Sequence, residues 1–246
     1  MEKHWTAQIE HRIKSMVCPL GVLRASKKKM DSHNAACVNA VKASGGQLTI
    51  VLHGILANYY TTVFPFVQWF KRSGIDVISI GFDYRNDLES AALEVKAQID
   101  AIIDECGATQ IHLIGISQGG VVARYYVEAL GGKEIVSKLV TVFSPLKEQE
   151  APNYSVPAMM HRFLAKKGAS QVSVNQYKTI ERSFSVPQLA LYGTRDLIIG
   201  RLALPTVSSQ NVKLVPMSRG HVLICFSIAV MEKTRAYLIG GHIDHV

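Results

Sequence analysis

The sequence contains few cysteines, and they show none of the spacings that bind metal. Cys18, Cys37, Cys106 and Cys225 form no CxxC or CxxH pair, so a zinc site is not expected. Four scattered cysteines are also too few for the disulfide framework of a small secreted domain. We expect them to be reduced and buried. The pattern therefore predicts neither a metal centre nor a cross-linked scaffold.

Long apolar runs are absent as well. No unbroken apolar stretch is long enough to span a bilayer. The first twenty residues carry Glu2, Glu10 and several basic side chains and have no apolar signal core. From these two absences we expect a cytoplasmic location.

Motifs that bind nucleic acid are missing, although the formal net charge is +8. The basic residues are scattered apart from the run Lys27, Lys28, Lys29, and no RNA- or DNA-binding motif accompanies them. We expect no nucleic-acid partner. A diffuse positive field can still concentrate anionic substrates or favour an anionic lipid surface, so peripheral membrane contact stays open.

What the sequence does contain is a regular alternation of strands and helices. About half of the 246 residues are apolar, which suits one large α/β domain. From Gly46 onward, short β-branched runs alternate with helical patterns, which is typical of a parallel sheet covered on both faces. Strand patterns occupy residues 48–52, 76–80, 111–114, 139–143, 189–192 and 212–215, and helical patterns occupy 61–72, 88–105, 121–130 and a segment after residue 220. The apolar stripe expected for the second of these helices comprises Leu93, Val95, Ile99, Ile102 and Ile103.

Two segments fall outside this alternation, so we divide the chain into an N-terminal helical extension (1–45) and an α/β domain (46–246). The extension has Trp5, Ile9, Ile13 and Met16 on one helical stripe. We expect this stripe to pack on its own domain or on a partner subunit, with a membrane surface as the alternative. Residues 147–185 form too long a connection between two strands, and we interpret them as a lid over the carboxyl ends of the sheet.

The pentapeptide from Gly115 to Gly119 matches the G-x-S-x-G pattern of a nucleophile elbow around Ser117. A serine hydroxyl is a poor nucleophile and must project from a sharp strand-to-helix turn toward a base. That turn strains the serine backbone and crowds the positions two residues away, so both must be glycine. A strand pattern before Ser117 and a helix pattern after it make an ordinary surface turn an improbable alternative. Gln118 then begins the helix and presents a free N–H to an oxyanion.

A second oxyanion donor is expected in the loop after the first strand pattern. Gly54 permits a tight turn there, so the N–H of Ile55 is the candidate donor, with Leu56 second. His53 precedes the turn, and we expect it to anchor the loop by hydrogen bonding rather than to act as the base.

The base and the acid are expected on the loops that follow the last two strands. His221 follows the last strand pattern and is our candidate base. Asp196 follows the strand before it and is our candidate acid, which would hold the imidazole tautomer and stabilise the imidazolium. The rival acids are Glu148 and Glu150, and the alternative role for Asp196 is that of a turn residue.

With the elbow, the oxyanion loop, the acid and the base in order, the stretch from Gly46 to the C-terminus resembles the α/β-hydrolase superfamily. Within it, the chain is most similar to small bacterial lipases and carboxylesterases with a His-Gly oxyanion motif. The resemblance implies an α/β-hydrolase fold, a mostly parallel sheet with helices on both faces and a small lid insertion. It also implies a triad of Ser117, Asp196 and His221, an oxyanion hole formed by Ile55 and Gln118, ester substrates and no cofactor.

One feature departs from the pattern of those lipases. Many carry Gly-Thr-Pro-His after the fourth strand, whereas this chain has Phe143, Ser144, Pro145 and Leu146 there. We therefore expect the lid hinge and the pocket wall to differ, which weakens a prediction of triacylglycerol hydrolysis.

The leading functional hypothesis is hydrolysis of a small-molecule or lipid carboxylic ester through an acyl-enzyme intermediate. Apolar side chains expected near the pocket favour an acyl chain over a charged metabolite, although they could equally be core: Tyr59, Met159, Met160 and Phe163. Thioester hydrolysis or acyl transfer on the same fold is the alternative. A non-catalytic membrane-surface or partner-binding module is a third reading, against which the complete set of catalytic side chains argues.

Overall fold

The computed structural model of the chain describes residues 27–55, 57–60, 63–146, 180, 183–194, 196, 210–218 and 227–240. The helices in these ranges are α2 (Lys27–Ser44), α3 (Phe64–Arg72), α4 (Leu88–Cys106), α5 (Gln118–Ala129) and α8 (Ile228–Leu238), with a 3-10 helix η2 (Gly132–Glu134). The strands are β1 (Leu48–Leu52), β2 (Val77–Ile80), β3 (Ile111–Ile116), β4 (Val136–Val142), β5 (Gln188–Gly193) and β6 (Val212–Met217). None of these helices is long and apolar enough to cross a membrane.

The strands form one sheet in the order β2-β1-β3-β4-β5-β6, and every neighbouring pair is parallel. Parallel strands carry helices on both faces and are therefore apolar almost throughout. In β1, for example, every residue is buried. This confirms the predicted α/β domain with a parallel sheet.

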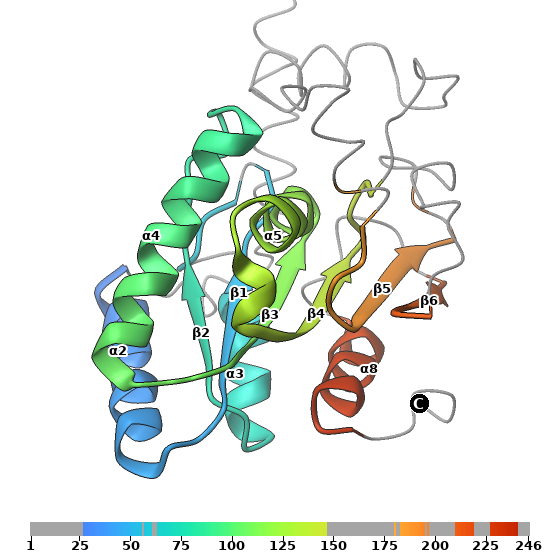
Figure 1. Cartoon of the computed structure of the whole chain (residues 1–246). Coiled ribbons are helices and arrows are strands. Elements are labelled where there is room, and N and C mark those ends of the chain that lie inside the picture. The colour runs from blue at the N-terminus through green and yellow to red at the C-terminus, as the bar shows by residue number, and fades with distance from the viewer. Residues whose placement is uncertain are drawn as a thin grey trace, which may run out of the picture.

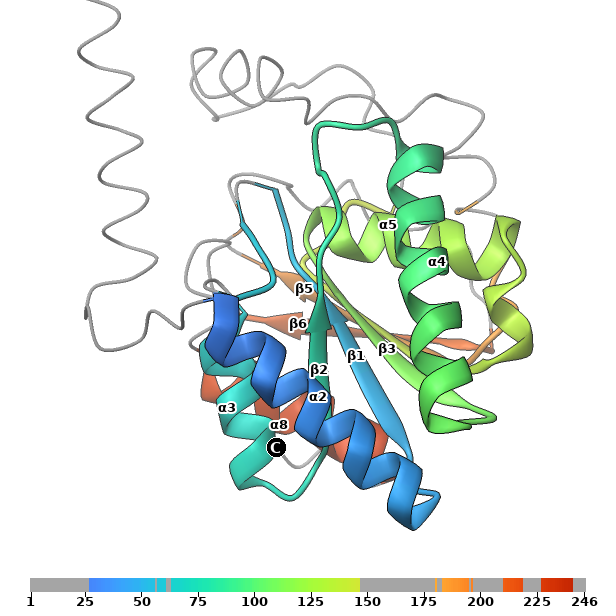
Figure 2. The ribbon, with the colours of Figure 1, turned by 90° about the vertical axis from the view of Figure 1, so that its left-hand side faces the viewer.

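Helices cover the two faces of the sheet in separate layers (Figures 1 and 2). Alternate side chains of β1 enter different cores. Leu48, Ile50 and Leu52 pack with residues of α4 and α5, whereas Val51 packs with residues of α3 and α8. Because successive side chains of a strand point to opposite faces of the sheet, one buried strand contributes to both hydrophobic layers.

Helix α2 lies along the outer edge of β2, the first strand of the sheet (Figure 2). Asn34 Nδ2 donates to the carbonyl oxygen of Ser79 at 2.7 Å, and Asn34 Oδ1 accepts from the Ser79 N–H at 3.1 Å. His33 Nε2 lies 2.9 Å from the carbonyl oxygen of Val77. An edge strand otherwise exposes such backbone groups, so α2 closes this edge.

The elements next to the elbow differ from their predicted bounds by a few residues. Strand β4 ends at Val142 rather than at Phe143, because Phe143 has φ of 50° and cannot continue a strand. Helix α5 begins at Gln118, directly after Ser117, as the elbow motif predicted, although the helical pattern by itself was marked only from residue 121.

The prediction that Leu93 belongs to the apolar stripe of α4 was wrong. Its exposed fraction is 48%, whereas Val95 and Ile99 are fully buried. Residues two apart on a helix point in nearly opposite directions, so Leu93 and Val95 cannot share one face.

Two predicted features fall outside the described residues. These are the stripe of Trp5, Ile9, Ile13 and Met16, and nearly all of the proposed lid, of which only Ile180 and residues 183–185 are described. The interpretations of both segments stay predictions.

Candidate active site

Ser117 joins β3 to α5 in a backbone conformation that few residues other than glycine adopt, with φ of 54° and ψ of −122°. The glycines around it explain the pentapeptide. A Cβ at Gly115 would lie 2.3 Å from Gly120 Cα, and a Cβ at Gly119 would lie 2.5 Å from the carbonyl oxygen of His53. Both are backbone clashes that nothing nearby can relieve. The strained turn and the two obligatory glycines are those expected of a nucleophile elbow.

The elbow lies where the order of the strands reverses. The chain runs outward from β1 to β2 and then crosses back to β3 on the other side of β1, so β1 and β3 are neighbours. Ligands bind open α/β sheets at such a switch point, outside the carboxyl ends of the strands. A Cβ at Gly54, just beyond β1, would lie 2.9 Å from Ser117 Cβ and 3.5 Å from its Oγ. The predicted oxyanion loop therefore contacts the predicted nucleophile.

His53 anchors this loop, as the sequence predicted. Its Nε2 accepts from the Phe82 N–H at 3.4 Å, so Nδ1 carries the proton and donates to the carbonyl oxygen of Gly54 at 2.8 Å. The imidazole also stacks on the Phe82 ring, with centroids 4.6 Å apart. Burial lowers the pKa of His53. A neutral ring with both nitrogens engaged suits an anchor and not a base.

The remaining oxyanion candidates flank Ser117 from two sides. Ile55 is a half-buried turn residue directly after Gly54, and Gln118 is the first residue of α5. The first N–H groups of a helix have no carbonyl partner in a preceding helical turn, so the N–H of Gln118 suits an oxyanion donor. The side chain of Gln118 turns aside, because its Nε2 donates to the carbonyl oxygen of Tyr84 at 3.2 Å. Leu56 lies outside the described residues.

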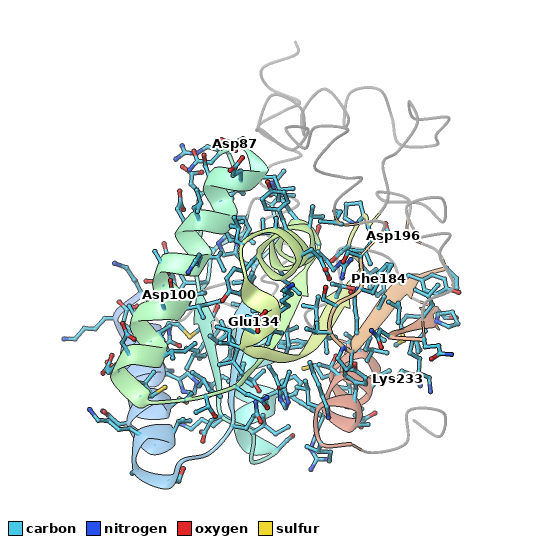
Figure 3. The ribbon with its side chains drawn as sticks, viewed as in Figure 1. Asp87, Asp100, Glu134, Phe184, Asp196 and Lys233 are labelled. Carbon is cyan, nitrogen blue, oxygen red and sulfur yellow. The ribbon has the colours of Figure 1, made fainter. Side chains whose placement is uncertain are left out.

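Asp196 is buried just beyond the carboxyl end of β5, with an exposed fraction of 7% (Figure 3). The next strand, β6, ends beside the same point, since Gly193 pairs with Met217 and the Thr194 N–H donates to the Met217 carbonyl oxygen at 2.9 Å. The carboxyl ends of β5 and β6 thus lie side by side. His221, Glu148 and Glu150 lie outside the described residues, so the choice of base and of acid stays a prediction.

Tyr59 lines a cavity of about 550 Å³ between α2, the oxyanion loop and the end of β2. Its hydroxyl donates to Asp31 Oδ1 at 2.9 Å, and burial, followed by this bond, raises the pKa of the phenol to about 12. Polar side chains contribute part of the lining, among them Asn34, Ser79, Asp83, Arg85, Glu94 and Gln98. The other expected pocket residues, Met159, Met160 and Phe163, lie outside the described residues.

With this geometry in view, similarity to known proteins identifies the family. A family model described as palmitoyl protein thioesterase matches residues 49–188, which is more than half of the chain. The chain belongs to the palmitoyl protein thioesterase family. The matched range of this thioesterase family contains Ile55, Ser117 and Gln118, whereas α2, Asp196 and His221 lie beyond its ends.

Solved structures extend the fold comparison beyond the thioesterase family. An esterase from Pyrococcus furiosus is 18% identical with a TM-score of 0.60, over 79% of this chain and 82% of that one. Est1E from Butyrivibrio proteoclasticus with ferulic acid bound is 15% identical with a TM-score of 0.57, over 79% and 89%. At such identities the likeness shows the fold alone, which is the α/β-hydrolase fold. A search of curated protein sequences found no match.

This family member keeps a strained residue beside the elbow that the sequence did not reveal. Phe143 has a positive φ although it is not glycine, and its N–H donates to the Leu191 carbonyl oxygen at 2.7 Å. The preceding residue, Val142, accepts the Ser117 N–H at 2.8 Å. A positive φ favours glycine, which is the residue many similar lipases carry at this place. The sequence showed that Phe143 stands where those lipases carry glycine, but only the structure showed that this residue has a positive φ.

Gly120 extends the elbow for a reason that is also tertiary. A Cβ there would lie 2.0 Å from Ser144 Oγ, so the loop after β4 packs closely against the first turn of α5.

No group of three or more His, Cys, Asp or Glu side chains that could hold a metal ion occurs within the described ranges.

Proposed function

We propose that this esterase- or thioesterase-type hydrolase cleaves carboxylic esters through an acyl-enzyme on Ser117. The observation that carries the proposal is the strained Ser117, with Gly54 of the oxyanion loop packed against its Cβ. The proposal sets the Ser117 hydroxyl beside the backbone N–H groups of Ile55 and Gln118, which is the arrangement that acyl transfer requires.

In the proposed reaction, Ser117 Oγ attacks the substrate carbonyl carbon while His221 accepts the hydroxyl proton. The carbonyl oxygen takes up the electron pair of the broken C=O π bond, and the N–H groups of Ile55 and Gln118 stabilise the resulting oxyanion. When the tetrahedral intermediate collapses, the leaving group departs with the proton from His221. Water then repeats the sequence on the acyl-enzyme, releases the acid and restores Ser117. Asp196 would hold the imidazole tautomer, and the side-by-side ends of β5 and β6 support this pairing.

Thioester hydrolysis is the second candidate, and the family match favours it. The chemistry at Ser117 is the same, except that a thiol leaves instead of an alcohol. Acyl transfer differs only in the acceptor, which replaces water in the second half of the reaction.

The test is a panel of p-nitrophenyl esters of rising chain length beside acyl-thioesters, with fluorophosphonate labelling of Ser117. We expect labelling and turnover in the wild type, and Ser117→Ala should lose both, with turnover down by roughly 10⁶. Specificity constants that favour thioesters at equal acyl length would establish the second candidate. Consumption of an added alcohol in preference to water would establish acyl transfer. A folded enzyme that neither labels nor turns over any substrate would refute the proposal.

A further inference from the structure

The oxyanion loop is held at both ends. Near Ser117, His53 bonds to Gly54 and to Phe82, and the Ala57 N–H donates to the Gly54 carbonyl oxygen at 3.3 Å. The far end of the loop is Tyr59, whose hydroxyl reaches Asp31 on α2. This bond joins two segments that are 28 residues apart in the sequence.

The ring of Tyr59 is fixed as well as its hydroxyl. A Cβ at Gly81 would lie 2.8 Å from Tyr59 Cδ1, so the ring lies directly on the backbone at the end of β2. Tyr60 packs edge-on against it, with ring centroids 5.2 Å apart. Tyr59 therefore spans from the loop across the end of β2 to α2.

Helix α2 is itself a firm attachment point. Asn34 hydrogen-bonds both backbone groups of Ser79, and His33 hydrogen-bonds the carbonyl oxygen of Val77. These bonds fix the position of the helix relative to β2 about one turn after Asp31. A path of packed and hydrogen-bonded groups thus runs from the edge of the sheet through Asn34, Asp31 and Tyr59 to the loop that contacts Ser117.

We propose that Asp31 and Tyr59 are positioning residues that hold the oxyanion loop in its catalytic place, so that α2 forms part of the active-site support. The inference rests on the proposed function, because it gives the loop a role in stabilising an oxyanion. It assigns a catalytic contribution to a helix that lies outside the part of the chain matched by the family. Small displacements of an oxyanion donor are costly, since the donor must meet the oxygen at its transition-state position.

The test compares Tyr59→Phe, Asp31→Ala and Asp31→Asn in the full chain. Tyr59→Phe and Asp31→Ala should each lower kcat by roughly tenfold with KM within about twofold, because a loosened loop weakens transition-state stabilisation more than substrate binding. Inhibition by an alkyl trifluoromethyl ketone, which forms a tetrahedral adduct with the serine, should weaken by the same factor. Asp31→Asn keeps an acceptor oxygen and should restore wild-type kcat. The double variant Tyr59→Phe/Asp31→Ala should lower kcat no further than either single variant does, because the two residues share one hydrogen bond.

Tyr237→Phe and Asp100→Asn are the matched controls. The Tyr237 hydroxyl makes no hydrogen bond among the described residues, and Asp100 forms only a surface pair with Lys96. Both controls should leave kcat and the inhibition constant unchanged.

Three results would overturn the inference. The first is wild-type kcat in folded Tyr59→Phe, which remains informative if Asp31→Ala does not fold. The second is a change confined to KM that varies with the leaving group, which would mean that these residues bind substrate in the cavity. The third is additive losses in the double variant. A Ser117→Ala enzyme that stays active would refute the proposed function instead, so the two failures are distinguishable.

Discussion

At the residue scale, strain and close contact are concentrated around Ser117. In the described part of the chain, Ser117 and Phe143 are the non-glycine residues with a positive φ. The Ser117 N–H donates to the carbonyl oxygen of Val142, and this hydrogen bond links the two turns. Such conformations cost about 1–3 kcal/mol each and persist only where the surroundings enforce them. Here the enforcing contacts are the backbone contacts of Gly115, Gly119 and Gly120.

The contact between Gly54 and Ser117 predicts the effect of adding one methyl group. Gly54→Ala should lower kcat/KM by roughly 10²-fold, because the new Cβ would push the oxyanion loop or the nucleophile out of place. The matched control is Gly74→Ala, whose Cβ meets nothing within 4 Å but whose φ is 74°. That variant should lose about 1 kcal/mol of stability and keep its activity. Esterase kinetics and thermal melts of both variants check the prediction, and equal kinetic losses would contradict it.

Asp196 gives a second prediction at this scale. Asp196→Asn should lower turnover by roughly 10⁴, because an amide favours the wrong tautomer of the base. Glu148→Gln and Glu150→Gln should have much smaller effects. Single-turnover kinetics of the three variants check this assignment. If either glutamine variant is the poorer enzyme, the acid has been placed on the wrong loop.

At the element scale, α5 does more than present the nucleophile. Arg124 and Glu128 form an ion pair at 2.8 Å whose side chains are almost fully buried. Arg124 also donates to the carbonyl oxygens of Ile180 and Ser183 and lies over the ring of Phe184, while Glu128 accepts from Ser185. The pair therefore fastens the segment that returns from residues 147–182 to the helix that follows Ser117.

Removing one charge of this pair should be costly. Burial alone would raise the pKa of Glu128, but the bonds from Ser183, Ser185 and Arg124 outweigh it and lower the pKa below its ordinary value of 4.5. Burial lowers the pKa of Arg124 to about 10, which keeps it cationic at neutral pH. Glu128→Gln would leave that cation without its counter-charge and should lower the free energy of unfolding by about 3 kcal/mol at pH 7.

The pH dependence of unfolding separates this pair from a surface one. Because the folded-state pKa of Glu128 is depressed, its stabilisation is present above about pH 4.5 and is lost as the pH falls through the folded-state value. The deficit of Glu128→Gln should therefore shrink in acid. Asp100→Asn, which breaks the exposed pair with Lys96, should cost less than about 1 kcal/mol. Urea unfolding at pH 7 and pH 4 measures both, and equal costs would contradict the argument.

At the scale of the whole molecule, the sheet collects its loops at one end. The predicted nucleophile, oxyanion loop and acid follow β3, β1 and β5, and parallel strands present all three at their carboxyl ends. The 147–185 insertion also follows a carboxyl end, that of β4. We expect this insertion to influence which acyl-chain lengths the enzyme accepts.

Phe163→Ala tests that expectation. Longer acyl chains would lose buried methylene contacts worth about 0.8 kcal/mol each, whereas short chains never reach the wall of the pocket. The variant should lower kcat/KM for octanoyl or decanoyl esters more than for acetyl or butyryl esters. A uniform loss along the series, together with a lower Tm, would mean that Phe163 belongs to the core.

The sequence by itself determined the alternation of strands and helices from residue 46 onward and the position of the elbow. Periods of two and 3.6 are local properties, and β1, for example, was predicted with its observed bounds. The G-x-S-x-G pattern can be read locally, although only Gly115 is demanded by contacts within a few residues, whereas Gly119 is demanded by the backbone of Leu52 and His53. His53 was predicted to be an anchor from its position before Gly54, and its hydrogen bonds to Gly54 and Phe82 confirm that role.

Only the tertiary structure decided which distant segments support the site. Nothing local in Asp31 or Tyr59 indicates that they bond to each other, because the contact depends on α2 lying along the edge of β2. The carbonyl oxygens that accept from Arg124, those of Ile180 and Ser183, are likewise more than 50 residues away, in a segment whose pattern shows no reason to bind a cation. Hydrogen bonds and burial between distant residues arise from packing, which no local pattern encodes.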